Sequence, residues 1–332
     1  MKAVVAQQYG PAEILTVEDI PVPQPGPGQI QVRVHAAALN PADLRTLSGA
    51  VRDLISLTFP HVPGSDFAGT VTEVGLGVTR YSPGDEVFGV GLPRATETMA
   101  AMLSTPPSLT TGAMAEYAVF EADTPAITRR PAHLSAEVAA SLPISGLTAL
   151  SVLEAGRFEA GDRVLVTGAA GGVGSTVVPL LAAAQLHVIA TAIPEDDAYV
   201  RGLGATEVID YRAVDTIAET LRRHPDGVDA LVNLALPGPA LVPASAVIRP
   251  GGQLVNVAFP SPDPSTFDRV DLSVQTVYSA ARPGALDELA ARSLPDVISR
   301  RYTLDDAAQA YADLVHTHVR GKLVVLPTDR LR

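Results

Sequence analysis

A short apolar strand that runs directly into a glycine-rich turn and then into a helix is the feature that most constrains this chain. Val164, Leu165 and Val166 predict a buried strand, and the turn Thr-Gly-Ala-Ala-Gly-Gly-Val-Gly-Ser follows at positions 167–175. Residues 173–185 are apolar on nearly all sides, as expected of a helix that packs on a sheet. The order of strand, glycine turn and helix is typical of the first unit of a dinucleotide-binding fold.

Two glycines of this turn have separate physical tasks. Gly171 lets the backbone approach a pyrophosphate, and Gly174 lets the helix pack closely on the strand. Ala169 stands where the G-x-G-x-x-G fingerprint has its first glycine, so the prediction depends on the flanking strand and helix as well as on the glycines. N–H groups at the start of the helix attract the anion. The residues expected at the pyrophosphate are Ala170, Gly171, Gly172 and Val173.

From residue 134 onward, Ala-rich helical stretches alternate with short apolar strands, which predicts an α/β fold with a doubly wound parallel sheet. An amphipathic helix is expected at 216–223. The predicted strands are residues 163–167, 187–191, 207–209, 230–234 and 253–257.

The first 90 residues have the pattern of short strands separated by turns, which predicts a β-rich lobe. Residues 30–34 alternate in polarity, and residues 21–28 are rich in Pro and Gly. Near the end of the chain, residues 304–315 predict a helix and residues 323–326 a strand. We expect this last segment to return to the first lobe. The predicted division is 1–125 for the β-rich domain, 126–270 for the nucleotide-binding domain and 271–332 for the returning segment.

Length and charge exclude several classes of function. A chain of 332 residues exceeds the usual size of a single core, so two lobes are expected. Its net charge of −12 repels phosphate backbones and anionic lipids, which argues against nucleic acid or a membrane as a partner. No apolar run reaches the roughly 20 residues that a membrane span needs, and we expect a cytoplasmic location.

The sequence contains no cysteine, which removes disulfides, thiolate nucleophiles and every zinc site built on cysteine. His316 and His318 lie two residues apart, and the remaining histidines are scattered along the chain. We therefore expect no metal site.

A fold of this type can bind NAD(H) or NADP(H), and the choice between these two dinucleotides depends on the end of the second predicted strand. That strand ends at Thr191 without the carboxylate that typically binds a ribose 2'-hydroxyl in NAD-preferring folds. Acidic residues at 195–197 would repel a 2'-phosphate unless Arg201, or Tyr211 and Arg212, meet it. The sequence favours NADP(H), and NAD(H) stays a possible coenzyme.

Several ordered motifs resemble the medium-chain dehydrogenase/reductase superfamily, and within it the zinc-free quinone oxidoreductase branch, over essentially the whole chain. The resemblance implies a GroES-like β lobe enclosing a Rossmann lobe, with substrate and nicotinamide in the cleft between them. It also implies a dimer or a tetramer, of which we expect a homodimer. The motifs are Ala-Leu-Asn-Pro-Ala-Asp at 38–43, Pro-Gly-Ser-Asp-Phe-Ala-Gly at 63–69, Gly-Asp-Glu-Val-Phe-Gly at 84–89, Gly-Ala-Met-Ala-Glu-Tyr-Ala at 112–118, the turn at 167–175, Pro-Gly-Gly at 250–252 and Gly-Lys at 321–322.

The same resemblance assigns roles to individual residues. Asn40 and Ser65 stand where zinc-dependent relatives have a catalytic Cys and His, and the four-Cys structural loop is missing. Asn40 and Thr148 should approach the nicotinamide ribose, and Tyr211 the adenosine 2'-phosphate. Asp197 stands nearest to the position of a lysine that often binds that phosphate in the family. Further residues expected to contact the coenzyme are Thr191, Leu234, Ala235, Val257, Ala258, Phe259 and Lys322.

The chemistry expected without a metal or a thiol is direct hydride transfer to a quinone or an α,β-unsaturated carbonyl. Asn40 is the candidate catalytic residue, as a hydrogen-bond donor to the substrate oxygen; Ser65 or a backbone N–H are alternative donors. Asp43 and Asp66 suit proton transfer, but a turn or capping role is favoured for each. The proton donor is left open.

Two other functions remain open at this stage. One is a pathway-specific enoyl reductase or cyclase acting on a biosynthetic intermediate, which a long segment at 92–111 suggests. That segment is expected to form a lid, an exposed loop or a dimer contact, and together with residues 51–61 it would select the substrate. The other is an NADP-binding sensor without turnover, because no residue stands out as an acid–base catalyst.

Overall fold

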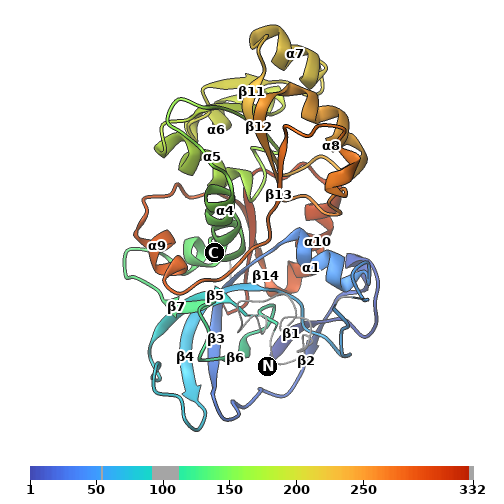
Figure 1. Ribbon diagram of the computed structural model, residues 1–332. Coiled ribbons are helices and arrows are strands. Elements are labelled where there is room, and N and C mark those ends of the chain that lie inside the picture. The colour runs from blue at the N-terminus through green and yellow to red at the C-terminus, as the bar shows by residue number, and fades with distance from the viewer. Residues whose placement is uncertain (54, 92–111, 329–332) are drawn as a thin grey trace. The chain divides into compact units, whose positions relative to one another are not determined.

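The computed structural model describes residues 1–53, 55–91 and 112–328 (Figure 1). The chain forms two units, residues 1–144 with 281–332 and residues 145–280. The segment at 92–111, which we expected to form a lid, an exposed loop or a dimer contact, lies outside the described residues. Within the described ranges, no helix is both long and apolar enough to cross a membrane.

The first unit is built around a sheet in which strand β3 (Gln29–Ala38) pairs with three neighbours. Ile30, Val32 and Val34 are fully buried, as the predicted alternation requires. The strand order over the described residues is β14-β15-β3-β4-β5-β7, with β6 also on β3. The helices and other strands of this unit are β1 Lys2–Val5, β2 Thr16–Asp19, α1 Pro41–Leu47, β4 Asp66–Val74, β5 Glu86–Val90, β6 Tyr117–Glu121, β7 Ile127–Arg129, α3 Ala136–Ser141, α9 Ala285–Ala291, β14 Ile298–Thr303, α10 Ala307–His316 and β15 Lys322–Leu326.

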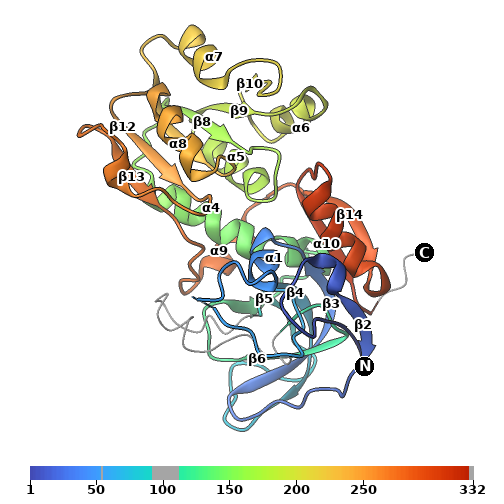
Figure 2. The ribbon, with the colours of Figure 1, turned by 90° about the vertical axis from the view of Figure 1, so that its right-hand side faces the viewer.

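The last segment of the chain returns to the first unit, where β15 pairs antiparallel with β3 and parallel with β14. Helix α10 packs on these two strands, and Figure 2 shows α10 beside β14 in red. Tyr311 of α10 is fully buried in the core of this unit, together with Leu323 and Val325 of β15. The predicted helix at 304–315 begins as a 3-10 turn at Leu304–Asp306, and α10 follows it.

The second unit is a six-stranded parallel sheet with the order β10-β9-β8-β11-β12-β13. Numbered along the chain, this is the 3-2-1-4-5-6 order of the dinucleotide-binding fold. The order reverses between β8 and β11, and α5 packs on β8 and β9. The elements of this unit are β8 Arg163–Thr167, α5 Gly174–Ala183, β9 His187–Thr191, α6 Asp197–Gly202, β10 Glu207–Ile209, α7 Thr216–Arg223, β11 Val228–Asn233, α8 Gly238–Ala244, β12 Ile248–Asn256 and β13 Ser273–Thr276.

The two boundaries between the units lie at 144/145 and 280/281, later in the sequence than the predicted boundaries at 125/126 and 270/271. Strand β7 completes the first sheet by pairing with β5, and α3 packs on β3 and β4, so the first unit extends to Ile144. Helix α4 (Pro143–Ala155) continues the chain into the second unit. Strand β13 is the sixth strand of the parallel sheet, so that unit extends to Ala280.

Candidate active site

A row of four polar side chains marks the carboxyl edge of the parallel sheet. Thr167 ends β8, Asn233 ends β11, Asn256 ends β12 and Thr276 ends β13. The strand register places Asn233 level with both Thr167 and Asn256, and Asn256 level with Thr276. Ligands of such folds bind at this edge, where the strand order reverses.

Hydrogen bonds link these side chains, of which Thr167, Asn233 and Asn256 are buried and Thr276 is exposed. Thr167 Oγ1 donates to Asn233 Oδ1 at 2.7 Å, and Asn233 Nδ2 donates to Asn256 Oδ1 at 2.8 Å. Asn256 Nδ2 donates to Ser261 Oγ at 3.0 Å, and that hydroxyl is 2.8 Å from Thr276 Oγ1. Asn233 and Asn256 are at most 1% exposed, so the row is rigid because buried polar groups must keep their partners.

The two asparagines also hold the loops that follow their strands. Asn233 Oδ1 accepts from the amides of Leu236 and Ala235, at 2.8 and 3.3 Å. Asn256 Nδ2 donates to the carbonyl of Ala258 at 3.0 Å. These loops contain the residues expected at the nicotinamide, which are Leu234, Ala235, Val257, Ala258 and Phe259.

Asn233 and Asn256 were not among the residues predicted from the sequence. The available signal was an asparagine close to the end of each of two consecutive apolar strands, 230–234 and 253–257.

The glycine turn connects β8 to α5 by close backbone contact. A Cβ on Gly174 would lie 2.3 Å from the carbonyl oxygen of Gly168, which has a φ of +73°. A Cβ on Gly171 would meet only that same oxygen, at 3.4 Å, so the turn presents bare backbone there. Ser175 Oγ donates to the Gly171 carbonyl at 2.8 Å and accepts from Tyr199 at 2.9 Å. The predicted pyrophosphate residues therefore lie on a fixed and sterically open turn.

Thr191, the last residue of β9, connects its strand to this turn. Its Oγ1 accepts a hydrogen bond from the Gly168 amide at 3.3 Å, and the residue is 5% exposed. The geometry gives Thr191 a part in positioning the turn, and its predicted contact with the coenzyme stays a prediction.

The loop after β10 presents an aromatic ring and a cation to solvent. Asp210 Oδ1 accepts from the amide of Arg212 at 2.9 Å, which fixes the loop. Tyr211 is 45% exposed, and the Arg212 guanidinium lies 5.9 Å from its ring centroid. No carboxylate within the described ranges forms an ion pair with Arg212.

The other candidate cation for a 2'-phosphate is already engaged. Arg201 Nε forms an ion pair with Asp197 at 2.9 Å, and its Nη1 donates to the Thr206 carbonyl at 3.1 Å. Of the groups predicted to meet a 2'-phosphate, Arg201 is therefore less suited. Tyr211 and Arg212 are the remaining candidates. The ion pair also offsets the charge of Asp197, one of the acidic residues expected to repel a phosphate.

In the first unit, five buried polar residues form one hydrogen-bonded cluster. Lys322 Nζ lies 2.6 Å from Asn40 Oδ1 and 3.3 Å from Asp66 Oδ2, and Asn40 Nδ2 donates to that same Asp66 oxygen at 3.0 Å. Ser65 Oγ donates to Asp43 Oδ1 at 2.6 Å, and the backbone N–H of Asn40 donates to Asp43 Oδ2 at 3.0 Å. We call these residues, Asn40, Asp43, Ser65, Asp66 and Lys322, the polar cluster.

Helix α1 and two strands bring the polar cluster together. Asn40 precedes Pro41 at the start of α1, and Asp43 lies in its first turn. Asp66 begins β4 and Lys322 begins β15, while Ala38, which ends β3, pairs with Asp66. The sheet thus joins residues that are 282 positions apart.

The polar cluster holds two carboxylates and a single ammonium group. Burial raises the pKa of Asp43 to about 6; the hydrogen bond from Ser65 opposes this rise, and the charge of Asp66 adds to it. Burial also raises the pKa of Asp66, against the opposing charge of Lys322. The cluster is neutral when Asp43 is protonated, because the charges of Asp66 and Lys322 then cancel.

The structure brings Asn40 and Lys322 together but buries both, at 4% and 3% exposure. The Lys322 ammonium contacts a carboxylate, so its immediate role is to neutralise Asp66. Asn40 Nδ2 likewise donates to Asp66, and its role as a donor to substrate stays a prediction. Thr148 lies on α4 in the second unit and is 3% exposed.

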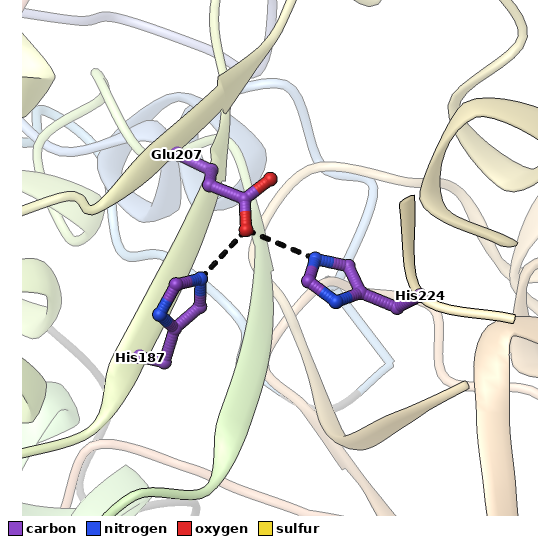
Figure 3. A group of neighbouring side chains, drawn as sticks. All are labelled: His187, Glu207 and His224. Carbon is purple, nitrogen blue, oxygen red and sulfur yellow. Dashed lines mark hydrogen bonds and ion pairs between the residues drawn. The ribbon is translucent and has the colours of Figure 1, made fainter. Parts of the chain in front are cut away.

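Two histidines that lie far apart in the sequence are neighbours in the structure. His187 and His224 lie together beside Glu207 (Figure 3). The ligand atoms of the three residues lie within 4.8 Å of one another. Spacing along the chain concealed this cluster because β9, β10 and α7 contribute one residue each.

Two family models match the chain. The alcohol dehydrogenase GroES-like domain matches residues 26–131, and the zinc-binding dehydrogenase domain matches residues 203–325.

Curated relatives align over most of the chain. A chloroplast envelope quinone oxidoreductase homolog of Arabidopsis thaliana is 31% identical, over 93% of this chain and 92% of its own length. The NADPH-dependent alkenal/one oxidoreductase of the same plant is 32% identical, over 98% and 80%. The mouse (Mus musculus) quinone oxidoreductase is 30% identical, over 98% of both chains.

Solved structures agree with these matches. The quinone oxidoreductase from Coxiella burnetii superposes with a TM-score of 0.84 at 30% identity, covering 98% of this chain and 99% of that one. A quinone oxidoreductase from Pseudomonas syringae pv. Tomato gives 0.82 at 26% identity, with the same coverage of both chains.

The buried carboxyl of Asp43 predicts a specific pH dependence of stability. Because its pKa rises from 3.8 to about 6 on folding, the native state binds a proton that the unfolded state lacks between about pH 4 and pH 6. The free energy of unfolding therefore contains a contribution that falls as pH rises through this window, by at most about 1.4 kcal/mol per pH unit. Urea unfolding of Asp43→Asn should lack this contribution.

The control is Asp305→Asn, which removes an exposed carboxylate of the same unit. Its unfolding free energy should follow the wild-type pH curve. Parallel curves for wild type and Asp43→Asn would show instead that Asp43 does not hold a proton in the native state.

Proposed function

The chain belongs to the medium-chain dehydrogenase/reductase superfamily, in its quinone oxidoreductase branch, and from this premise we propose that it reduces quinones or α,β-unsaturated carbonyls with NAD(P)H, without zinc. The observation that carries the proposal is the glycine turn at the reversal of strand order in the second unit. Relatives named quinone oxidoreductase and NADPH-dependent alkenal/one oxidoreductase align with nearly the whole chain.

The glycine turn fits the pyrophosphate of a dinucleotide. Bare backbone at Gly171 leaves room for phosphate oxygens. Helix α5 begins at Gly174, so its first N–H groups and its dipole favour an anion at this point. Ala170, Gly171, Gly172 and Val173 would hold the phosphates.

At the nicotinamide end of the coenzyme, the chain would orient the ring. Nicotinamide, when bound, supplies the hydride. Asn233 and Asn256 fix the loops after β11 and β12, so backbone groups of Ala235 and Ala258 would hold the ring without rearrangement. Such preorganised backbone groups cost no reorganisation during the reaction.

The polar cluster would act on the substrate oxygen and its proton. The reduced product needs a proton, and the carboxyl of Asp43, whose pKa burial raises to about 6, can hold one at pH values up to about 6. Ser65 Oγ, 2.6 Å from that carboxyl, is the hydroxyl through which the proton would pass. Asn40 Nδ2 donates to Asp66 and, over a longer distance of 3.5 Å, to the Ala38 carbonyl. The substrate oxygen would replace that longer contact and be oriented by the same amide hydrogen.

This cluster also supports a reaction without zinc. Its fixed positive charge is the ammonium of Lys322, and the chain has no cysteine to supply a thiolate ligand. Asn40 and Ser65, the residues that stand at the family's zinc-ligand positions, are committed to hydrogen bonds with Asp66 and Asp43.

We propose NADPH as the preferred coenzyme. Arg212 has no carboxylate partner among the described residues and lies beside the exposed ring of Tyr211, so it can meet a 2'-phosphate. A homodimer and a cytoplasmic location stay predictions, and several relatives are described as chloroplastic.

The activity is tested by following the loss of NADPH absorbance in the presence of a panel of quinones and enones. We expect oxidation that depends on the acceptor and continues in EDTA. Tight NADPH binding without turnover on any acceptor would contradict the proposal and favour a sensor.

The coenzyme preference is tested by replacing Arg212 with alanine. Loss of a charge-assisted bond to the 2'-phosphate should weaken NADPH binding by roughly ten-fold or more and leave NADH binding unchanged. Dissociation constants from coenzyme fluorescence measure both. Arg222→Ala is the matched control, because Arg222 is an exposed arginine that is already paired with Glu219. Equal weakening for both coenzymes in Arg212→Ala would refute the assignment.

A further inference from the structure

The group formed by His187, Glu207 and His224 lies at the edge of the parallel sheet opposite to the glycine turn. His187 is the first residue of β9 and Glu207 the first residue of β10, whereas the turn follows the last residue of β8. His224 caps the end of α7. Strands of this length place the group roughly 13 Å from the carboxyl edge, so the proposed coenzyme site does not account for it.

Both imidazoles face the same carboxylate oxygen, as Figure 3 shows. His187 Nε2 lies 2.6 Å from Glu207 Oε1, and His224 Nε2 lies 3.0 Å from it. The two rings are 5.9 Å apart between centroids and stand at 72° to each other. Two nitrogen ligands therefore approach one oxygen ligand from different directions.

The backbone holds each of these residues in place. The His187 amide donates to the Asp162 carbonyl at 2.8 Å, and the His224 amide donates to the Thr220 carbonyl at 2.8 Å. Glu207 is paired in the sheet with Ile189. The side chains are thus presented by fixed elements of one compact unit.

We propose that His187, Glu207 and His224 form a binding site for one divalent transition-metal ion, with Zn²⁺ as the occupant. Two imidazole nitrogens and one carboxylate oxygen are a known ligand set of zinc, with bonds of about 2.0–2.2 Å. Ligand atoms around a tetrahedral ion of that size lie about 3.3 Å apart. The two nitrogen–oxygen distances of 2.6 and 3.0 Å need to widen by less than 1 Å to match this value.

The surroundings of the carboxylate favour this use. Arg223 Nη1 lies 3.3 Å from the other oxygen, Oε2, so Oε1 is the oxygen that faces the histidines. Such a contact orients a ligand in the way that outer partners do at metal sites. Arg222 and Arg223 both form ion pairs with Glu219. The two positive charges of these arginines therefore balance the two negative charges of Glu219 and Glu207.

The exposure of the group leaves a coordination position open. The side chains of His187, Glu207 and His224 are 34, 23 and 12% exposed. An ion can therefore enter from solvent and keep a water molecule as its fourth ligand. Once bound, it would cross-link β9, β10 and α7 and stabilise this edge of the unit.

The test is calorimetric titration of the EDTA-treated, desalted full chain with ZnCl₂. We expect one ion per chain at this site and a higher melting temperature in its presence. His187→Gln and His224→Gln should each weaken binding by roughly 100-fold or more. His316→Gln is the matched control, because His316 also contacts a carboxylate, Glu13 at 3.3 Å, but lies outside this group. Its affinity for zinc should equal that of wild type.

Two outcomes overturn the proposal: no binding at millimolar ZnCl₂, or equal binding by wild type and both glutamine variants. If a variant does not fold, the absorption spectrum of wild type with CoCl₂ decides. Strong visible bands indicate four-coordinate Co²⁺, and the weak spectrum of hydrated Co²⁺ contradicts the site. NADPH oxidation by His187→Gln should equal that of wild type, so failure of the metal site and failure of the proposed reductase activity are distinguishable.

Discussion

The close contact between the end of β8 and the start of α5 is the constraint on which the candidate site depends. A Cβ on Gly174 would lie 2.3 Å from the Gly168 carbonyl oxygen, so strand and helix meet at backbone distance. That contact fixes the turn between them and directs the helix start toward the sheet edge. The row from Thr167 through Asn233 to Asn256 then holds the adjacent loops. The second unit is thus built to position a ligand, which suits a reaction whose chemistry belongs to a coenzyme.

The first unit buries three ionisable groups in the polar cluster, Asp43, Asp66 and Lys322, and its stability depends on how their charges are compensated. Desolvation of two carboxylates and an ammonium group opposes folding unless hydrogen bonds and opposite charges offset it. Here Lys322 and Asp66 form the ion pair, Asn40 bonds to both, and Asp43 relieves the remaining excess of negative charge by its raised pKa. A buried carboxyl with a pKa of about 6 can still hold a proton at pH values where an exposed aspartate has lost it, and a reductase acting on a carbonyl can use that proton.

Local sequence signals predicted the elements in which apolar pattern and turn chemistry agree. Strands β8, β9 and β10 and helix α7 have the predicted bounds. Strand β13 (Ser273–Thr276) was not predicted because it is mostly polar and joins the sheet as its edge strand. Strand β14 carries Arg300 and Arg301, which conceal its pairing with β15.

The sites were predictable only where the motif is local. The turn at 167–175 is contiguous, so its residues could be identified from spacing. Lys322 and Asn40 meet through β15 and β3, and His187 and His224 meet beside Glu207, so neither group leaves a signal in sequence spacing. The resemblance to a family identified Asn40 and Lys322 as notable, but only the structure shows that they bond to each other and to Asp66.

Hydrogen–deuterium exchange of the peptide covering residues 168–177, with and without saturating NADPH, tests the central claim most directly. If the turn and the first residues of α5 hold the pyrophosphate, their amides should exchange more slowly with the coenzyme bound, while peptides from the opposite sheet edge near His224 keep their rates. Binding of NADPH without any slowing between 168 and 177 would contradict the account.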